Sequence, residues 1–106
     1  MAINSRQKGA AGERELAKIL RDHGYEARRG QQFSGVNGDP DVVGLCGYHV
    51  ECKRVEKLNL EAAMAQSERD AREGEVPIVA HRKNRSKWLV TMSLEHFLEL
   101  IGGKAE

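Results

Sequence analysis

The sequence lacks the features that mark secreted, disulfide-bonded and membrane proteins. It has only two cysteines, Cys46 and Cys52, which do not form a Cys-x-x-Cys pair, so we expect reduced thiols and no disulfide framework. No apolar run approaches the ~20 residues that a transmembrane helix needs, and no secretory signal peptide opens the chain. We therefore expect a cytoplasmic protein without a membrane partner. The sequence also shows no internal repeat, low-complexity tract or linker.

The composition is that of one small globular domain over residues 1–106. Hydrophobic residues make up 40% and charged residues 31% of the chain. A domain of this size buries only about 60–70% of its unfolded surface, so its core is thin and dimerisation is an ordinary way to add buried area. The net charge of +1 neither identifies nor excludes a nucleic-acid partner, because acidic residues that bind metal ions would leave an excess of basic residues for DNA.

Hydrophobic periodicity and turn residues predict three helices and five strands. The helices are predicted over Ser5–His23, Asn59–Glu73 and Leu94–Ile101, and the strands over Tyr25–Arg29, Asp41–Leu45, Tyr48–Arg54, Val76–Arg82 and Trp88–Met92. Residues 30–38 are predicted to form a loop because they are rich in glycine and polar residues. The order α-β-β-β-α-β-β-α implies an α/β fold in which one mixed β-sheet is flanked by helices.

The predicted hairpin over residues 41–54 carries the clearest sign of chemistry. Side chains two apart share one face of a strand, so Glu51 and Lys53 point the same way, while Val50 and Cys52 point into the core. A carboxylate and an ammonium group are unusual on one face of an otherwise apolar strand. They indicate either a functional site or an ion pair at the surface.

A third charged residue favours the functional site. Asp41 begins the strand that precedes Glu51, and the short turn between the two strands brings the two carboxylates together. Two hard oxygen ligands in one pocket suit Mg²⁺ or Mn²⁺, which prefer a few carboxylates together with water and phosphate. Such an ion lowers the pKa of a bound water, and Lys53 offsets the charge that develops in the transition state.

The first helix adds another carboxylate to this set. At 100° per residue, Glu13 lies beside Leu20 at the edge of the buried stripe, where a carboxylate must be paired, neutral or bound to a ligand. Glu15 is expected to face Lys18 and Asp22 on the solvated side. We therefore prefer Glu13 as the functional residue of this helix.

These motifs resemble those of known nucleases. Pro40–Asp41 and Glu51–Lys53 are similar to the PD-(D/E)XK nuclease signature. Residues 8–16 (KGAAGEREL) and His23–Tyr25 are similar to the start of archaeal-type Holliday junction resolvases. The resemblance extends over roughly residues 8–54, and the chain after them no longer matches closely.

The resemblance implies a restriction-endonuclease-like fold, a divalent metal ion and hydrolysis of DNA phosphodiester bonds. It implies that the acidic active-site residues are Glu13, Asp41 and Glu51, that Lys53 is the catalytic lysine, and that Arg14 and Arg29 contact the DNA backbone. Those resolvases act as symmetric dimers on four-way junctions during DNA recombination and repair. A homodimer on branched DNA is therefore expected.

Several further residues are weaker candidates for the site. Gln66 matches a glutamine found in other PD-(D/E)XK branches, including virus-type replication-repair nucleases, although a helical glutamine is usually solvated. Ser34 lies where resolvases often carry a loop serine, and His49 shares the face of Glu51. The remaining candidates for DNA contact are the basic residues Arg54, Arg82, Lys83, Arg85 and Lys87.

The sequence leaves several functions open. The leading hypothesis is a Mg²⁺-dependent or Mn²⁺-dependent endonuclease that resolves Holliday junctions. The alternatives are a less selective phage-type nickase or replication-repair nuclease, a DNA-binding module that keeps the fold without cleaving, and an accessory subunit of a larger nuclease. Because all four catalytic positions are filled, the sequence favours cleavage over binding alone.

Overall fold

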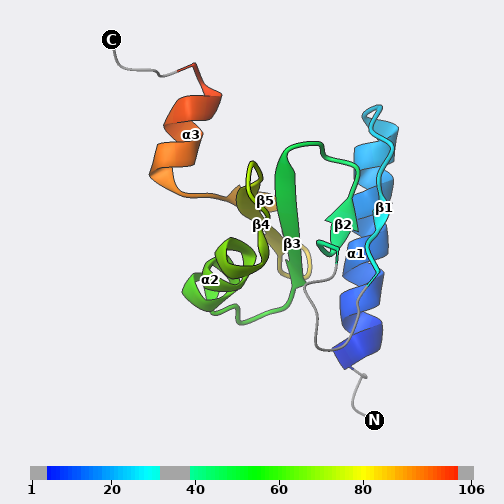
Figure 1. The fold of residues 1–106 in the computed structure, drawn as a ribbon. Helices are drawn as coiled ribbons and strands as arrows, with labels where there is room; N and C mark the ends of the chain where they lie inside the picture. Colours follow the sequence, from blue (N-terminus) through cyan, green and yellow to red (C-terminus); the bar gives the residue numbers. More distant parts are fainter. Residues whose placement is uncertain (1–4, 32–38, 103–106) are drawn as a thin grey trace.

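The computed structural model describes residues 5–31 and 39–102, which form three helices and five strands (Figure 1). In chain order the elements are α1 (Ser5–Asp22), β1 (Arg28–Arg29), β2 (Val42–Val43), β3 (Tyr48–Arg54), α2 (Leu60–Asp70), β4 (Val76–Arg82), β5 (Leu89–Thr91) and α3 (Leu94–Leu100). The predicted order and the predicted α/β class are confirmed. Within the described segments no helix is long and apolar enough to cross a membrane.

The described strands form one mixed sheet in the order β1-β2-β3-β4-β5. Strands β3 and β4 run parallel, with Glu51 opposite Val79, whereas the other neighbouring pairs run antiparallel. A parallel pair needs a crossover connection, and α2 provides it. The predicted hairpin is confirmed, and Gly47 lies in its turn with a φ of 89°, which favours glycine. Strand β3 is therefore central.

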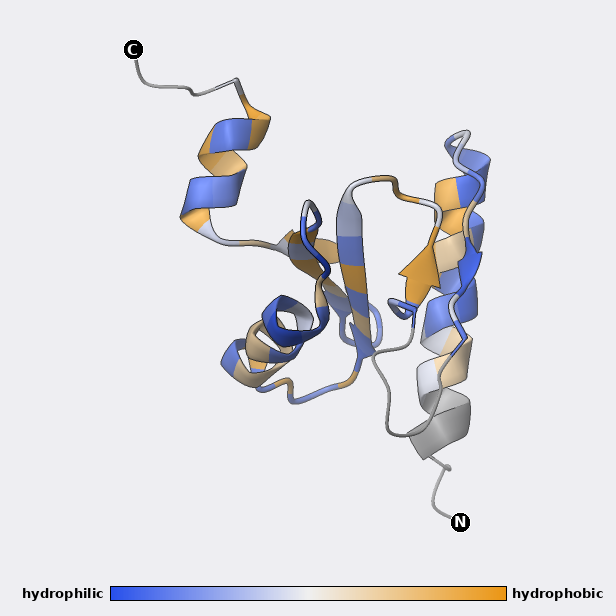
Figure 2. Cartoon of the chain, in the orientation of Figure 1, coloured by the Kyte–Doolittle hydropathy of each residue, from blue (hydrophilic) through white to orange (hydrophobic). Residues whose placement is uncertain are grey.

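Helix α1 covers one face of the sheet and encloses the main core. Leu16 and Ala17 of α1 are buried against Val50 and Cys52 of β3. The apolar colour on the sheet side of α1 follows this contact in Figure 2. The prediction that Val50 and Cys52 point into the core is therefore confirmed. Their neighbours His49, Glu51 and Lys53 point to the other face.

Helix α2 covers that second face. Asn59 caps its N-terminus by accepting a hydrogen bond from the backbone N–H of Ala62 at 3.0 Å. Ser67 is fully buried, and its hydroxyl lies 3.1 Å from the carbonyl oxygens of both His49 and Ile78. Because these carbonyls belong to β3 and β4, Ser67 fixes the helix against both strands of the parallel pair.

Several predicted elements extended beyond the observed ones. Strand β1 keeps only the last two residues of the predicted Tyr25–Arg29, and β2 keeps only Val42–Val43. Gly44 ends β2 with a φ of 112°, and a side chain there would collide with the backbone carbonyl of Glu26. Helix α2 ends at Asp70 and not at Glu73, because the next residue is extended, with φ −64° and ψ 139°.

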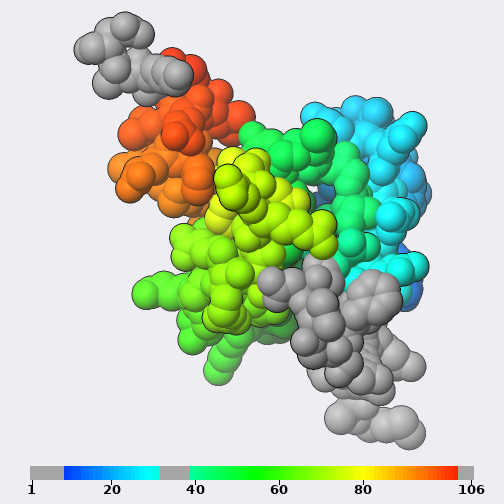
Figure 3. Space-filling model, viewed as in Figure 1, coloured from blue at the N-terminus to red at the C-terminus, as the bar shows by residue number. Residues whose placement is uncertain are grey.

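Helix α3 lies apart from the rest of the molecule. Ser93 caps it by accepting a hydrogen bond from the backbone N–H of His96, but none of its described residues is buried. It extends away from the sheet in Figure 1 and stands out from the body in Figure 3. The apolar residues exposed on α3 and just after it are Leu94, Phe97, Leu98, Leu100 and Ile101. These apolar side chains stay largely exposed in the described part of the chain.

Candidate active site

The predicted acidic residues meet at the edge of the sheet where the chain enters β2. Asp41 precedes this strand, and its backbone N–H donates to the carbonyl oxygen of Val50 at 2.9 Å. Its carboxylate oxygen Oδ2 accepts a hydrogen bond from the backbone N–H of Cys52 at 2.8 Å. Two bonds to the residues that flank Glu51 therefore hold the Asp41 side chain beside that residue.

Glu51 is a buried carboxylate, with only 3% of its surface exposed. Its Oε2 lies 3.6 Å from Nζ of Lys53, which is partly exposed, so the two share one face as predicted. Burial, together with the negative charge of Asp41, raises the pKa of Glu51 to about 7, while the positive charge of Lys53 opposes the shift. Because Glu51 is buried, the alternative of an ion pair at the surface does not apply to it.

Glu13 completes the acidic set from α1. Its side chain is 14% exposed and accepts a hydrogen bond from Nε of Arg29 at 3.0 Å. Burial raises its pKa, the hydrogen bond from Arg29 lowers it, and the charge of Asp41 raises it again. Helix α1 comes close to β3 here, because an added Cβ on Gly12 would lie 2.9 Å from Cβ of Arg54. Glu13 is partly buried, which agrees with the expected position at the edge of the buried stripe.

This arrangement suits a divalent cation. Asp41, at the start of β2, lies near enough to Glu13 of α1 and to Glu51 of β3 to raise the pKa of each, and hard oxygen donors are what Mg²⁺ and Mn²⁺ prefer. Burial raises the pKa values of Glu13 and Glu51, and the charge of Asp41 raises both further. A divalent cation would stabilise the charged form of both carboxylates, so the residues present fit a metal ion.

The weaker candidates have different outcomes. Gln66 lines a pocket of about 300 Å³ together with Lys53, so it lies near the acidic set. His49 is buried on the Glu51 face. Ser34 lies outside the described residues. Sequence reasoning missed Asp70, which contributes to the electrostatic environment of Glu51. Its spacing of four residues from Gln66 was the available signal, since such residues share a helix face.

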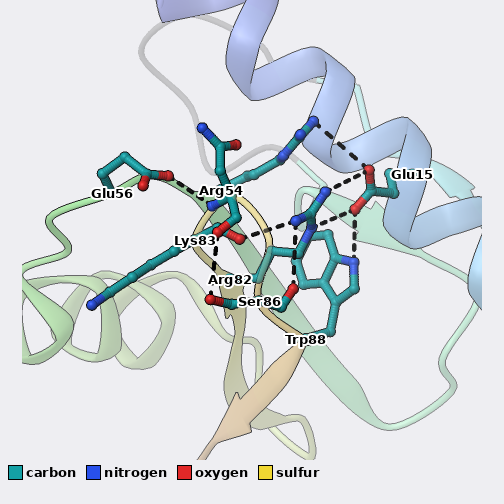
Figure 4. Close-up of polar contacts among 8 residues, drawn as sticks. Glu15, Arg54, Glu56, Arg82, Lys83, Ser86 and Trp88 are labelled. Atoms are coloured by element: carbon teal, nitrogen blue, oxygen red, sulfur yellow. Dashed lines mark hydrogen bonds and ion pairs between the residues drawn. The ribbon is translucent and has the colours of Figure 1, made fainter.

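The position expected for Glu15 was wrong. Its carboxylate accepts hydrogen bonds from Nε of Arg82 at 2.6 Å, from Nη2 of Arg82 at 3.1 Å and from Nε1 of Trp88 at 2.9 Å. Figure 4 shows these groups converging on Glu15 from the β4–β5 connection, with Arg54 on the far side at 3.7 Å. The hydrogen bond from Arg82 lowers the pKa of Glu15. The neighbours of Glu15 on the helix suggested that it faces solvent, but Arg82 and Trp88, which are distant in sequence, contact this side of α1.

The predicted DNA-contact residues fall into two groups. Three of them form salt bridges within the protein: Arg29 pairs with Glu13, and Arg54 and Arg82 pair with Glu15. The other four are exposed and lie on α1 and on the β4–β5 turn: Arg14, Lys83, Arg85 and Lys87. Within this turn Arg85 adopts a φ of 61°. The exposed group is the one that is free to reach a phosphate backbone.

Comparisons with known proteins agree with this geometry. The structure is similar to that of Hjc, a Holliday junction resolvase from Archaeoglobus fulgidus, with a TM-score of 0.54 and 23% sequence identity over 80% of this chain and 72% of that chain. At this identity the likeness shows the fold alone. No curated protein matches the sequence. A family model described as "Phage putative PDDEXK endonuclease" matches residues 4–104. Because this match spans almost the whole chain, the protein belongs to this family of phage PDDEXK endonucleases.

Proposed function

We propose that the protein is a divalent-metal-dependent DNA endonuclease whose preferred substrate is a four-way junction. The convergence of Glu13, Asp41, Glu51 and Lys53 carries the proposal, because it joins three buried or half-buried carboxylates to one lysine. A purely structural cluster gains nothing from a carboxylate whose pKa is raised to about 7. Asp41 and Glu51 are the principal metal ligands, and Glu13 is the third.

The residues divide the chemistry among themselves. The metal ion, when bound, neutralises charge on the scissile phosphate and acidifies water at the site. Asp41 is held by the backbone of β3 and Glu51 by burial, so both present fixed carboxylates. The Nζ of Lys53, next to Glu51, orients the attacking water and stabilises the negative charge of the pentacoordinate phosphorus. Water adds to phosphorus, one P–O ester bond breaks, and the departing oxygen takes a proton.

Two features support the junction as substrate. Residues 8–54 resemble archaeal-type resolvases, and the fold is similar to that of one such enzyme. The family description names an endonuclease of phages and no junction, which favours the less selective phage-type nickase or replication-repair nuclease as the second candidate. In the junction role the protein would act in DNA recombination and repair.

A cleavage assay distinguishes these functions. The wild-type protein is incubated in Mg²⁺ with a labelled four-way junction, a linear duplex and a single strand of the same sequence. We expect paired cuts in the junction and little cutting of the other two. Equal cutting of all three would establish the less selective nuclease, and binding without cutting would establish a DNA-binding module. The Asp41→Asn variant controls for contaminating nucleases.

The identity of the metal ion is tested separately. Mg²⁺ or Mn²⁺ should support cleavage, whereas Ca²⁺ should bind without turnover, because its larger and looser coordination shell fits a tight octahedral arrangement poorly. Activity is measured after removal of metal with EDTA and addition of each ion in turn. Full activity in EDTA would remove the metal from the mechanism.

We also propose that two copies form a homodimer. The surface available for this contact consists of β5 and α3. Strand β5 lies at the edge of the described sheet with Leu89 and Val90 more than half exposed, and the apolar residues of α3 are exposed beside it. Apolar surface that is contiguous and exposed marks an interaction site, and a second copy offers the same apolar face in return.

Sedimentation equilibrium of the isolated protein tests the dimer. The wild type should sediment as a dimer at micromolar concentration, and Phe97→Glu should shift it to monomer by placing a charge in the contact. Glu95→Gln on the same helix is the matched control. A wild-type monomer at every concentration would contradict the proposal.

A further inference from the structure

A second group of metal-ligating side chains lies on the α2 side of the sheet, next to the acidic set. One ring nitrogen of His49 and one carboxylate oxygen each of Glu51 and Asp70 lie within 4.8 Å of one another. His49 and Glu51 come from β3, two residues apart on one face, and Asp70 is the last residue of α2. Of this group only Glu51 belongs to the active site described above.

His49 is the unusual member of the group. Its side chain is 3% exposed, and its Nδ1 is buried without a hydrogen-bond partner among residues 5–31 and 39–102. The nearest acidic atom to Nδ1 is Oε1 of Glu75 at 3.4 Å, an ionic contact only if the ring is protonated. Leaving a buried polar atom without a partner destabilises the folded protein. The ring therefore faces a place where a ligand would satisfy it.

The charges around the ring have the sign that a cation needs. Glu51, Asp70 and Glu75 surround His49, and Asp41 lies on the far side of Glu51. The basic side chain beside Glu51 is Lys53, which lies at the opposite end of the His49–Glu51–Lys53 face. A buried region with this excess of carboxylates is destabilised unless positive charge is added.

We propose that His49, Glu51 and Asp70 bind a second divalent ion, one of the transition metals that accept an imidazole ligand. Imidazole nitrogen suits Fe²⁺ and Zn²⁺, and Mn²⁺ accepts it beside carboxylates, whereas Mg²⁺ and Ca²⁺ favour oxygen alone. Binding through Nδ1 would satisfy the buried nitrogen that has no hydrogen-bond partner, and it would place the ion next to Glu75, whose Oε1 lies 3.4 Å from the same atom.

The two sites share Glu51 and differ in their other ligands. The active site uses Asp41 and Glu13 and is all oxygen, while the second site adds nitrogen from His49 and oxygen from Asp70. A cation in the second site would also contact Glu51 and so hold its carboxylate in one direction at the active site. This inference rests on the His49 cluster and stands whether or not the substrate is a junction.

The nitrogen ligand makes the site directly observable. Metal-free, untagged protein is loaded with Mn²⁺ in the absence of DNA, and coupling of ¹⁴N to the bound ion is recorded by electron spin echo spectroscopy. The wild type should show nitrogen coupling, and Asp41→Asn should keep it, since Asp41 belongs only to the oxygen site. His49→Gln should abolish it, and Asp70→Asn should weaken Mn²⁺ binding at this site at least tenfold.

Two controls keep the outcome unambiguous. His81→Gln, which changes a histidine of β4 whose Nε2 contacts Thr91 at 2.9 Å, should leave the coupling intact. Asp70 is only partly buried, so Asp70→Asn tests the site even if His49→Gln does not fold. Absence of nitrogen coupling in the saturated wild type, or coupling that survives His49→Gln, would overturn the proposal. Because no DNA is present, this result is independent of cleavage, and a protein that shows the coupling without cutting DNA would contradict the proposed nuclease function instead.

Discussion

Glu15 and Glu51 are the same residue type in opposite circumstances. Glu15 receives hydrogen bonds from Arg82 and Trp88, and its pKa is lowered. Glu51 is more deeply buried, lies next to Asp41, and has its pKa raised to about 7. One carboxylate is satisfied by the protein, and the other is satisfied only when a proton or a metal ion is supplied.

The two glutamates therefore serve different purposes: Glu15 contributes to the stability of the fold, and Glu51 contributes to function. Glu15 joins α1 to the β4–β5 connection, so its partners contribute to holding the fold together (Figure 4). Glu51 instead weakens the metal-free fold, because an ionised carboxylate in a buried place is costly. Residues of the second kind are expected where a ligand binds. Substitutions at the two positions should therefore have opposite consequences, and four predictions test this.

The largest effect is expected from loss of a principal metal ligand. Asp41→Asn or Glu51→Gln should abolish cleavage in Mg²⁺ while DNA binding stays the same or tightens, because each removes a ligand and a negative charge near the phosphate. Steady-state cleavage and gel-shift affinity measure the two effects separately. A variant with near-normal turnover would show that the buried carboxylates are not the metal site.

The next effect concerns the lysine beside Glu51. Lys53→Ala should lower the cleavage rate at least ~100-fold, the usual scale for removing one electrostatic stabiliser of a transition state. The fold should survive, since the side chain is partly exposed at the pocket. Single-turnover rates and melting temperatures are compared with the wild type. A melting temperature low enough to explain the lost rate would make Lys53 a structural partner of Glu51.

The site was predictable from sequence where the relevant spacing is local. The two-residue period of β3 put Glu51 and Lys53 on one face, and the helical period put Glu13 on the buried side of α1, and both placements agree with the structure. The fold order followed from the same periodicities. These inferences succeeded because they depend on neighbours within a single strand or helix.

Sequence reasoning failed where the partner is distant. Glu15 was assigned to solvent because its helix neighbours are polar, but Arg82, which binds it, is 67 residues away. Asp70 was missed because its place beside His49 depends on how α2 crosses the sheet. The hydrophobic periodicity predicted the helix α3, but no local signal says whether its apolar residues are buried, and none of them is.

A smaller effect should distinguish the two glutamates of α1. Glu15→Gln should lower the free energy of unfolding by about 1–3 kcal/mol, because it weakens the charge-assisted hydrogen bonds from Arg82. Its activity should persist at temperatures where it stays folded. Glu13→Gln should do the reverse and lose cleavage with little loss of stability.

Thermal melting and cleavage of both variants, with the exposed Glu68→Gln as control, provide the measurements. If Glu15→Gln were the inactive enzyme and Glu13→Gln the active one, the assignment of α1 would be wrong, and with it the match to the resolvases.

The smallest effect is in the pH dependence of stability, where the two carboxylates act in different windows. The pKa of Glu51 is about 7 in the folded protein, against a usual value of 4.5, so between these values the folded state holds a proton that the unfolded state has lost. The stability of the metal-free protein should therefore fall as pH rises from 4.5 to 7, by an amount on the order of 1–3 kcal/mol. Glu15 has a lowered pKa, so the stability it contributes is lost only as pH falls below 4.5.

Urea unfolding in EDTA across this range isolates the contribution of Glu51. Glu51→Gln should flatten the fall between pH 4.5 and 7 and stabilise the metal-free protein at pH 8. Asp41→Asn should flatten it in part, because the charge of Asp41 is one cause of the raised pKa. Mg²⁺ at pH 8 should stabilise the wild type and have little effect on Glu51→Gln, since the ion supplies the positive charge that the buried carboxylate lacks. If Glu51→Gln kept the full pH dependence, another group would cause the fall in stability between pH 4.5 and 7. The contrast drawn between Glu51 and Glu15 would then be wrong.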